Sequence, residues 1–277
     1  MRTLKTRDGA RPERSEPASP TAAGAESVIA AQQVSFSYAS GSKLILDSLD
    51  LDVKEGEIVV FIGPSGCGKS TVLGLIAGVL QPTSGTLTCK GLPVKGLNRS
   101  VSYMTQKDTL LPWRNALDNA ALPLEIKGVA KKERHERARQ ALASVGLEDA
   151  EHLRPHQLSG GMRARLSLAR ALLGDTDILL MDEPFAAVDA LSRMRLQQLL
   201  VSLWDRTRKT IIYVTHDLDE AINLGHRVVV MGKRQGIHHE EPIPAPQPRD
   251  IAIYKSTPEA RELYATLWNS LESQITP

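Results

Sequence analysis

A glycine-rich segment, Gly63–Ser70, has the residue types and spacing to bind phosphate groups. It reads G-x-x-x-x-G-K-S between the apolar runs Ile58–Ile62 and Thr71–Ile76, which predicts a strand, a loop and a helix. In such a loop the backbone N–H groups converge on phosphate oxygens, Lys69 reaches the β- and γ-phosphates, and the Ser70 hydroxyl holds Mg²⁺. The candidate phosphate-binding residues are Gly63, Pro64, Ser65, Gly66, Cys67, Gly68, Lys69, Ser70 and Thr71. The loop alone predicts a nucleoside triphosphate site and does not separate a kinase, a GTPase, a helicase or a transporter motor.

Two acids follow a second apolar run, Ile178–Met181, which is typical of a buried strand. In a nucleotide site, Asp182 would bind Mg²⁺ through its water shell, and Glu183 would polarise the attacking water. Neighbouring positions at a strand end supply the different geometry that these two roles need. The alternative is a pair of solvated acids at a strand-to-loop corner.

A third motif, Leu158–Met162, predicts a second helix N-terminus suited to an anion. Ser159 is an N-cap candidate, and the N–H groups of Gly160 and Gly161 can be approached closely. Because one triphosphate already has the Lys69 loop at its phosphates, this terminus is predicted to face the γ-phosphate of a nucleotide held by another copy. The alternative is a helix cap with a flexible entry.

The elements around these motifs predict an α/β fold. Residues 28–53 and 85–89 alternate apolar and polar side chains, which is typical of half-buried strands in an antiparallel layer. Residues 115–174 have helical signals and form an inserted helical region. The later strands alternate with helices and predict a parallel sheet covered on both faces: strands 178–181, 210–214 and 228–231, helices 191–204 and 218–224. A proline-rich bend then precedes a predicted terminal helix at 258–271.

Composition narrows the class of protein. A chain of 277 residues with 42% hydrophobic content buries a substantial core, and a net charge of +2 disfavours nucleic acid as a partner. Its two cysteines, Cys67 and Cys89, stand where a disulfide is not expected, which indicates a reducing setting. No apolar stretch approaches the roughly 20 residues that span a bilayer. Residues 1–27 mix charged and small residues without an apolar core, so we expect a disordered leader.

Four motifs together resemble the ATP-binding subunit of ABC transporters: Gly63–Ser70, Leu158–Met162, Ile178–Glu183 and Thr215-His216-Asp217. The resemblance covers about residues 28–273. It implies a P-loop NTPase fold, in which a RecA-like parallel sheet core carries an antiparallel β subdomain and an inserted helical subdomain. The implied divisions are an ATPase domain at 28–240, its helical subdomain at about 107–174, and a C-terminal extension at 241–277 with the terminal helix.

The resemblance also implies roles for single residues. Tyr38 would stack on the adenine, and Gln106 would sense Mg²⁺ and link the site to a membrane partner. Asp189 would sit at a dimer seam, and His216 would hydrogen-bond the γ-phosphate. Taken singly, these residues could instead be a strand aromatic, a polar loop residue, a helix cap and a satisfied histidine. The implied catalytic residues are Glu183, His216 and Lys69, and the implied Mg²⁺ contacts are Ser70, Gln106 and Asp182.

The implied mechanism is a head-to-tail sandwich of two chains around two ATP molecules. Each site pairs the Lys69 loop of one chain with Ser159–Gly161 of the other, ATP closes the seam and hydrolysis reopens it. The partners would be a second copy or a homologous ATPase subunit, an integral membrane permease and, indirectly, a solute-binding protein. The protein would lie peripherally on the cytoplasmic face of the membrane. The alternatives are a soluble ABC-type ATPase of DNA repair or translation, and a non-hydrolysing regulator.

A finer resemblance lies in the run Gln106–Asn115, which reads QKDTLLPWRN, and in the segment Thr257–Tyr264. Both resemble importers of the nitrate, sulfonate and taurine group. Leu110, Leu111 and Trp113 suit a groove for a short permease helix, or they belong to the core. The chain departs from the family at Ala164, where Gln is usual, and at Val188, where Leu is common, and the basic pattern expected at 232–241 is absent. The transported substrate itself is not encoded in a subunit of this kind.

Overall fold

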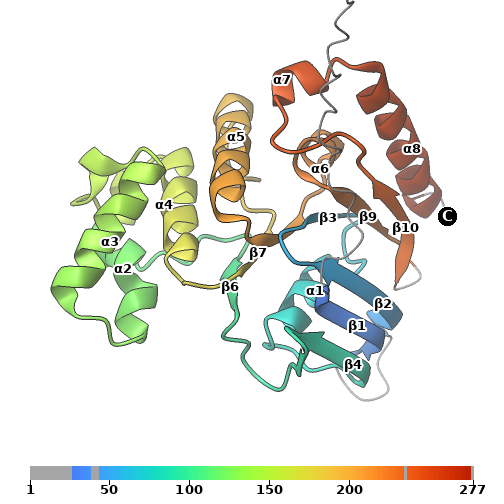
Figure 1. Cartoon of the computed structure of the whole chain (residues 1–277), viewed down its shortest axis with the longest axis horizontal. Coiled ribbons are helices and arrows are strands. Elements are labelled where there is room, and N and C mark those ends of the chain that lie inside the picture. Colours follow the sequence, from blue (N-terminus) through green and yellow to red (C-terminus); the bar gives the residue numbers. More distant parts are fainter. Residues whose placement is uncertain (1–26, 39–43, 234–235, 276–277) are drawn as a thin grey trace, which may run out of the picture.

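The computed structural model describes residues 27–38, 44–233 and 236–275 (Figure 1). Its central sheet has six strands in the order β10-β9-β3-β8-β7-β6. All neighbours pair in parallel except β10, which is antiparallel to β9. The bounds are β3 Ile58–Ile62, β6 Val101–Met104, β7 Ile178–Asp182, β8 Thr210–Val214, β9 Arg227–Met231 and β10 Ile237–Pro242. The carboxyl ends of the five parallel strands therefore meet along one edge, where the predicted site residues follow β3, β6, β7 and β8.

The central sheet is buried on both faces, as the sequence predicted. Successive residues of β3 belong to two different hydrophobic clusters: Ile58, Val60 and Ile62 to one, Val59 and Phe61 to the other. A strand with both faces covered must be apolar at every position, which explains the unbroken run of five apolar residues. The expected α/β fold with a parallel core is confirmed.

One face carries α1, Lys69–Ile76, and an antiparallel sheet in the order β2-β1-β4-β5. The bounds of these strands are β1 Ser27–Phe36, β2 Leu46–Lys54, β4 Ser84–Cys89 and β5 Leu92–Pro93. In β2, Leu49, Leu51 and Val53 are buried, whereas the residues between them are exposed. This alternation is typical of a sheet with one face on the core. Residues 1–26 of the expected leader lie outside the described part, and Ser27, which that expectation included, begins β1.

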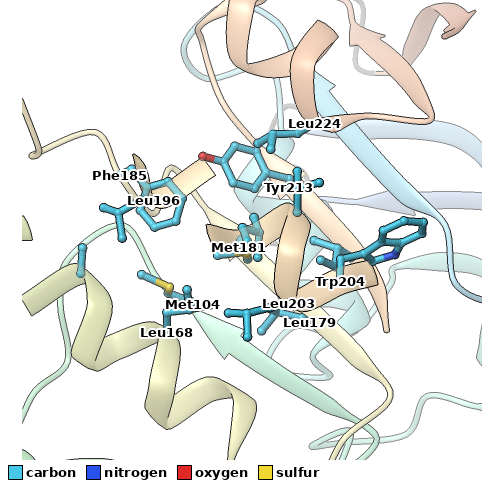
Figure 2. Packing of buried hydrophobic residues seen from close by; sticks show 14 of the residues in the cluster. Met104, Leu168, Leu179, Met181, Phe185, Leu196, Leu203, Trp204, Tyr213 and Leu224 are labelled. Atoms are coloured by element: carbon cyan, nitrogen blue, oxygen red, sulfur yellow. The ribbon is translucent and has the colours of Figure 1, made fainter. Parts of the chain in front are cut away.

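The other face carries α5, Ala190–Thr207, and α6, Leu218–Leu224. Figure 2 shows how Met181 and Tyr213 of the sheet pack with Leu196 of α5 and with Leu168 of α4. Full burial of a large apolar side chain contributes about 1.5–3 kcal/mol. Because one continuous cluster joins the sheet to α4, the helix that begins after Ser159 is held by the same core as the strands.

The region expected to be a helical subdomain contains only helices and loops (Figure 1). Its elements are α2 Ala116–Ile126, α3 Lys131–Ser144, η1 Glu148–Ala150, η2 Pro155–Gln157 and α4 Gly160–Leu172. Asn115 caps α2 by accepting a hydrogen bond from the Asp118 N–H at 2.8 Å. Asn119 is fully buried, and its amide bonds the backbone N–H and C=O of Leu111 and the carbonyls of Arg114 and Asn115. The Leu111–Asn115 loop is thereby fixed to α2.

The C-terminal segment packs on the same core. Its helices are α7, Ile251–Tyr254, and α8, Pro258–Ile275, which extends beyond the predicted residue 271. Ala260, Leu263 and Leu267 of α8 are buried in the cluster that contains α6 and the sheet. β10 was not predicted because four of its six residues, IHHEEP, are polar and none is buried, as is common for edge strands.

Arg249 connects this segment to α6, and its replacement gives a first prediction. Its guanidinium is 8% exposed and donates to the carbonyls of Ile222, at 2.7 Å, and Ala245, at 2.6 and 2.9 Å. Burial lowers its pKa to about 10. We expect Arg249→Met to lower the free energy of unfolding in urea by about 1–3 kcal/mol, because buried carbonyls lose their donors. Arg206→Met, at an exposed position on α5, should change it by less than about 0.5 kcal/mol. Equal values for the two variants would contradict this assignment.

Candidate functional site

The phosphate loop connects β3 to α1 in a backbone conformation that requires glycine. Gly63 and Gly68 have φ angles of 153° and 104°. A Cβ at Gly63 would lie 2.6 Å from the Met231 carbonyl oxygen, and one at Gly68 would lie 2.7 Å from a methyl of Leu46. The backbone conformation disfavours a larger residue at both positions, and the Met231 carbonyl leaves no space for one at Gly63, so this loop shape depends on glycine. Its N–H groups and the N-terminus of α1 are then ready to receive an anion.

Lys69 already lies inside this loop. Its side chain is 8% exposed, and Nζ donates to the carbonyl oxygens of Gly63 and Pro64 at 2.8 and 2.9 Å. Phosphate oxygens can take the place of these carbonyl oxygens as acceptors for Nζ. The Cys67 thiol lies 3.8 Å from Nζ, and burial raises its pKa, which keeps it a neutral thiol rather than a nucleophile. Both Cys67 and Cys89 are buried free thiols, in agreement with the expectation of no disulfide.

Asp182 ends β7 as a buried carboxylate, 8% exposed. Burial raises its pKa, and hydrogen bonds from Ser70 and Tyr103 act in the opposite direction. The Tyr103 hydroxyl lies 3.4 Å from Oδ2, and burial together with the Asp182 charge raises the pKa of Tyr103, so the phenol remains a neutral donor. Tyr103 was not predicted from the sequence, because only the pairing of β6 with β7 brings it to Asp182.

Ser70 and Asp182 bring together a hydroxyl and a carboxylate oxygen, which are donors that Mg²⁺ prefers. No group of three or more His, Cys, Asp or Glu side chains forms a metal site within the part of the chain that the structure describes. A Mg²⁺ ion held by one or two protein oxygens and by nucleotide phosphates does not need such a group. The residues present therefore fit the metal that the sequence predicted.

Glu183, Gln106 and His216 meet at the same edge of the sheet, although they are far apart in the sequence. Gln106 Nε2 donates to Glu183 Oε2 at 3.0 Å, and His216 Nδ1 lies 3.5 Å from the same oxygen. Glu183 has a φ of 44°, which is rare for a residue with a side chain, and its N–H donates to the Val214 carbonyl at 3.0 Å. Strained residues of this kind often lie at functional sites. Gln106 contacts Glu183 here, and its predicted contact with Mg²⁺ stays a prediction.

Ser159 and Asp189 are both helix caps. The Ser159 hydroxyl accepts from the Met162 N–H at 3.2 Å, and Asp189 accepts from the Ser192 N–H at 3.0 Å. The bond from the Ser192 N–H lowers the pKa of Asp189. The two caps are near each other, because a Cβ on Gly161 would lie 3.8 Å from Ser192. The helix caps that the sequence analysis gave as the simpler alternatives for Ser159 and Asp189 are therefore present. Capping leaves other backbone N–H groups of each helix N-terminus available.

Ser159–Gly161 and the phosphate loop belong to different parts of the fold. The helix after Ser159, α4, packs with α2 and α3, whereas α1 packs with the antiparallel sheet (Figure 1). Among the described residues, no hydrogen bond joins Ser159, Gly160 or Gly161 to Gly63–Thr71. The chain therefore carries two separate helix N-termini, and phosphate binding at Ser159–Gly161 stays a prediction.

Tyr38 lies on the antiparallel sheet just after β1. Its ring is 69% exposed and packs edge-on against Phe36, with 5.0 Å between the ring centroids. A ring held at one edge and open on its faces can stack on a planar base. Its contact with adenine stays a prediction.

A groove of about 970 Å³ is lined by residues of α2, α4 and β6 and of the segment that follows β7. It contains Gln106 and Gly160, so it reaches both parts of the candidate site. Leu110 does not line it, because this side chain is 7% exposed and belongs to the core, whereas Trp113 is 69% exposed on the fixed Leu111–Asn115 loop. Of the two interpretations of this run, the core is therefore correct for Leu110. The two departures from the family, Ala164 and Val188, are buried residues that line the groove.

A phosphate loop on a parallel sheet, two acids at the end of β7, a histidine after β8 and an inserted helical region define an ABC-type ATPase. The chain belongs to the ABC transporter family, whose pattern matches residues 46–186. It is therefore an ATP-binding subunit with ATPase activity coupled to transport. No helix in the described ranges combines the length and the apolar character needed to cross a bilayer.

Several known proteins are similar to this chain in sequence or in structure. The taurine import ATP-binding protein TauB of Rhizobium johnstonii is 48% identical over 193 residues, 69% of this chain and 73% of that protein. An uncharacterized ABC transporter ATP-binding protein of Methanocaldococcus jannaschii is 42% identical over 241 residues, 87% of this chain and 89% of that one. A solved ATP-binding cassette, a dimer in a post-hydrolysis state bound to ADP and Pi, is 32% identical, with a TM-score of 0.71 over 78% of this chain and 99% of that one.

Proposed function

We propose that this chain is the ATPase subunit of an importer for a small anion of the sulfonate type, with taurine as the first candidate. The observation that carries the ATPase part is the meeting of Gln106, Glu183 and His216 beside Asp182 at one edge of the sheet. The taurine import proteins of three bacterial genera, which are 42–48% identical, support the substrate class. The solute itself would be delivered by a solute-binding protein and carried by the permease.

Hydrolysis would use groups that the fold already orients. Glu183 accepts the proton of the attacking water, and Gln106 and His216 hold its carboxylate in position. Lys69 exchanges its bonds to the loop carbonyls for bonds to phosphate oxygens. His216 is 65% exposed, so its imidazole is free to approach a γ-phosphate from the open side of the site. Mg²⁺, held by Ser70 and Asp182 with Gln106 near, would neutralise developing phosphate charge.

The second half of each site would come from another copy of the chain. Ser159–Gly161 lies apart from the phosphate loop of its own chain, and the adjacent cap at Asp189 lies on the same surface. A head-to-tail dimer brings the N-terminus of α4 to the triphosphate of the partner, where its N–H groups complete the site. ATP then stabilises the closed dimer, and loss of the γ-phosphate releases it.

The permease would dock in the groove beside Gln106. The protein would then lie peripherally on the cytoplasmic face of the membrane, with this groove turned toward the bilayer. Apolar side chains line the groove: Leu97, Leu122, Pro123, Ile126, Ala164 and Val188. Basic side chains also line it: Arg99, Lys107, Lys127, Arg163 and Arg170. A short helix with an apolar face and acidic residues fits this lining. Of the lining side chains, Ile126 is 78% exposed, so it offers apolar contact area to a partner.

The test is uptake into proteoliposomes that contain this chain, its permease and its solute-binding protein. We expect ATP-dependent uptake of taurine, with nitrate and an alkanesulfonate measured in parallel. Ile126→Glu should lower uptake roughly tenfold or more and leave the ATPase activity of the isolated chain unchanged. Leu92→Glu, a similarly exposed residue on β5, is the control and should leave uptake intact. Failure to take up both taurine and the alkanesulfonate, whether or not nitrate is transported, would refute the proposed substrate class.

A further inference from the structure

Glu220 is a buried carboxylate near the site that the proposed reaction does not use. It lies on α6, is 6% exposed, and receives hydrogen bonds from three side chains. Gln197 Nε2 donates to Oε1 at 2.9 Å, the Tyr213 hydroxyl to Oε2 at 3.2 Å, and the Thr215 hydroxyl to Oε2 at 2.6 Å. Figure 2 shows Tyr213 among the packed residues, with its hydroxyl at the edge of that cluster. A buried acid is costly unless its partners are held in place, so this arrangement fixes several elements together.

Thr215 connects Glu220 to the loop that carries His216. Its hydroxyl donates to Glu220 and accepts a hydrogen bond from the Asp217 N–H at 3.0 Å. The backbone is therefore fixed on both sides of His216, while the imidazole stays exposed. The position of His216 beside Glu183 depends on this turn.

Arg193 connects the same carboxylate to the loop that carries Asp189. Its Nη2 donates to the Val188 carbonyl at 3.0 Å, and Nη1 lies 3.7 Å from Asp217 Oδ2. Its Nε lies 3.8 Å from Glu220 Oε1 and, within the described residues, makes no hydrogen bond. A displacement of less than about 1 Å would bring this pair to hydrogen-bond distance. The ion pair can therefore tighten when the Asp189 loop moves.

We propose that Glu220 is a positioning residue that joins the His216 loop, through Thr215, to the Asp189 loop, through Arg193. A shift of the Asp189 loop at the dimer seam is thereby transmitted to the histidine beside Glu183. The inference rests on the proposed function, which assigns Asp189 to the seam and His216 to the γ-phosphate. Residues that orient catalytic groups act through geometry, and small displacements at a site have large effects on rate.

The test measures steady-state ATPase activity of the full chain at several ATP concentrations. We expect Glu220→Gln to lower kcat roughly tenfold with little change in KM, because the charge that attracts Arg193 is lost and ATP binding is not touched. Thr215→Val should have a similar effect, and Thr215→Ser, which keeps the hydroxyl, should restore most of kcat. The Thr215→Val/Glu220→Gln double variant should be no slower than the slower single variant, because both changes break the same connection.

Glu57→Gln is the matched control. Glu57 is also a largely buried acid, 14% exposed, and pairs with Arg227 at 2.7 Å. It precedes β3, at the opposite end of that strand from the phosphate loop. Its variant should lose stability and keep kcat. If Glu220→Gln does not fold, Arg193→Lys replaces it, because Arg193 is 26% exposed and Lys cannot reproduce the fork of contacts.

Two results would overturn the inference: an unchanged kcat in the folded Glu220→Gln or Arg193→Lys chain, or additive losses in the double variant. Neither result would affect the assignment of Glu183. Conversely, normal ATP turnover in the Glu183→Gln chain would refute the proposed site, whatever kcat the Glu220→Gln chain has. The two failures are therefore distinguishable.

Discussion

Replacing Glu183 with Gln is expected to lower kcat for ATP hydrolysis by roughly 10²–10⁴-fold while ATP still binds, which is the usual range for loss of a general base. Gln keeps the size of the side chain, and it can still contact Gln106 and His216 once the amides reorient. It cannot accept a proton from water. Because Lys69, Ser70 and the phosphate loop are unchanged, the affinity for ATP depends on groups that the substitution does not touch.

The measurement is phosphate release by the purified chain, with equilibrium binding of a fluorescent ATP analogue measured alongside. Glu57→Gln serves again as the control, because it removes a carboxylate at the amino end of β3, far along the strand from the site. It should hydrolyse ATP at close to the normal rate. Near-normal turnover in Glu183→Gln would contradict the assignment of the base, and loss of ATP binding would show that Glu183 has a role in holding the loop.

The parts of the site that the sequence predicted are those encoded by contiguous residues. The loop at Gly63–Ser70 and the acids after Ile178–Met181 are local patterns in which residue type and neighbouring elements determine the geometry. The meeting of the site residues at one edge was also predictable, because parallel strands bring their carboxyl ends to the same edge of a sheet. His216 was implied by the family resemblance alone, and it lies beside Glu183 because β7 and β8 are adjacent in the sheet.

The residues that were not predicted depend on contacts between distant segments. Tyr103 reaches Asp182 only because β6 pairs with β7, and Glu220 reaches Thr215 and Tyr213 only because α6 folds back on β8. Asn119 carried a local signal, an amide on an otherwise apolar helix face, although its partners in the Leu111–Asn115 loop could not be derived from it. The edge strand β10 lacks an apolar pattern because one side of it is open to solvent.

Closure of the dimer should be blocked by a negative charge at the start of α4. Gly160→Asp places a carboxylate where the γ-phosphate of the partner's nucleotide is proposed to bind. A Cβ at Gly160 would lie 3.4 Å from the Ala187 carbonyl, which is ordinary contact, so the chain should fold. Like charges brought together at an interface cost several kcal/mol, and we expect ATP-dependent dimerisation to weaken by at least roughly 100-fold. Ser159→Arg should act similarly, because it removes the cap on the Met162 N–H and fills the exposed entry to the helix.

The measurement is size-exclusion chromatography with ATP, in the Glu183→Gln background so that hydrolysis does not reopen the dimer. Gly160→Ala is the matched control, because it adds the same Cβ without a charge and should still dimerise. ATP binding by the monomer should be equal in the parent chain and in all three variants, since the Lys69 loop has no hydrogen bond to Ser159–Gly161 among the described residues. If Gly160→Asp instead removes ATP binding from the monomer, the segment faces the nucleotide of its own chain. The Ser159–Gly161 segment would then belong to a complete site within one copy, and the shared site would be wrong.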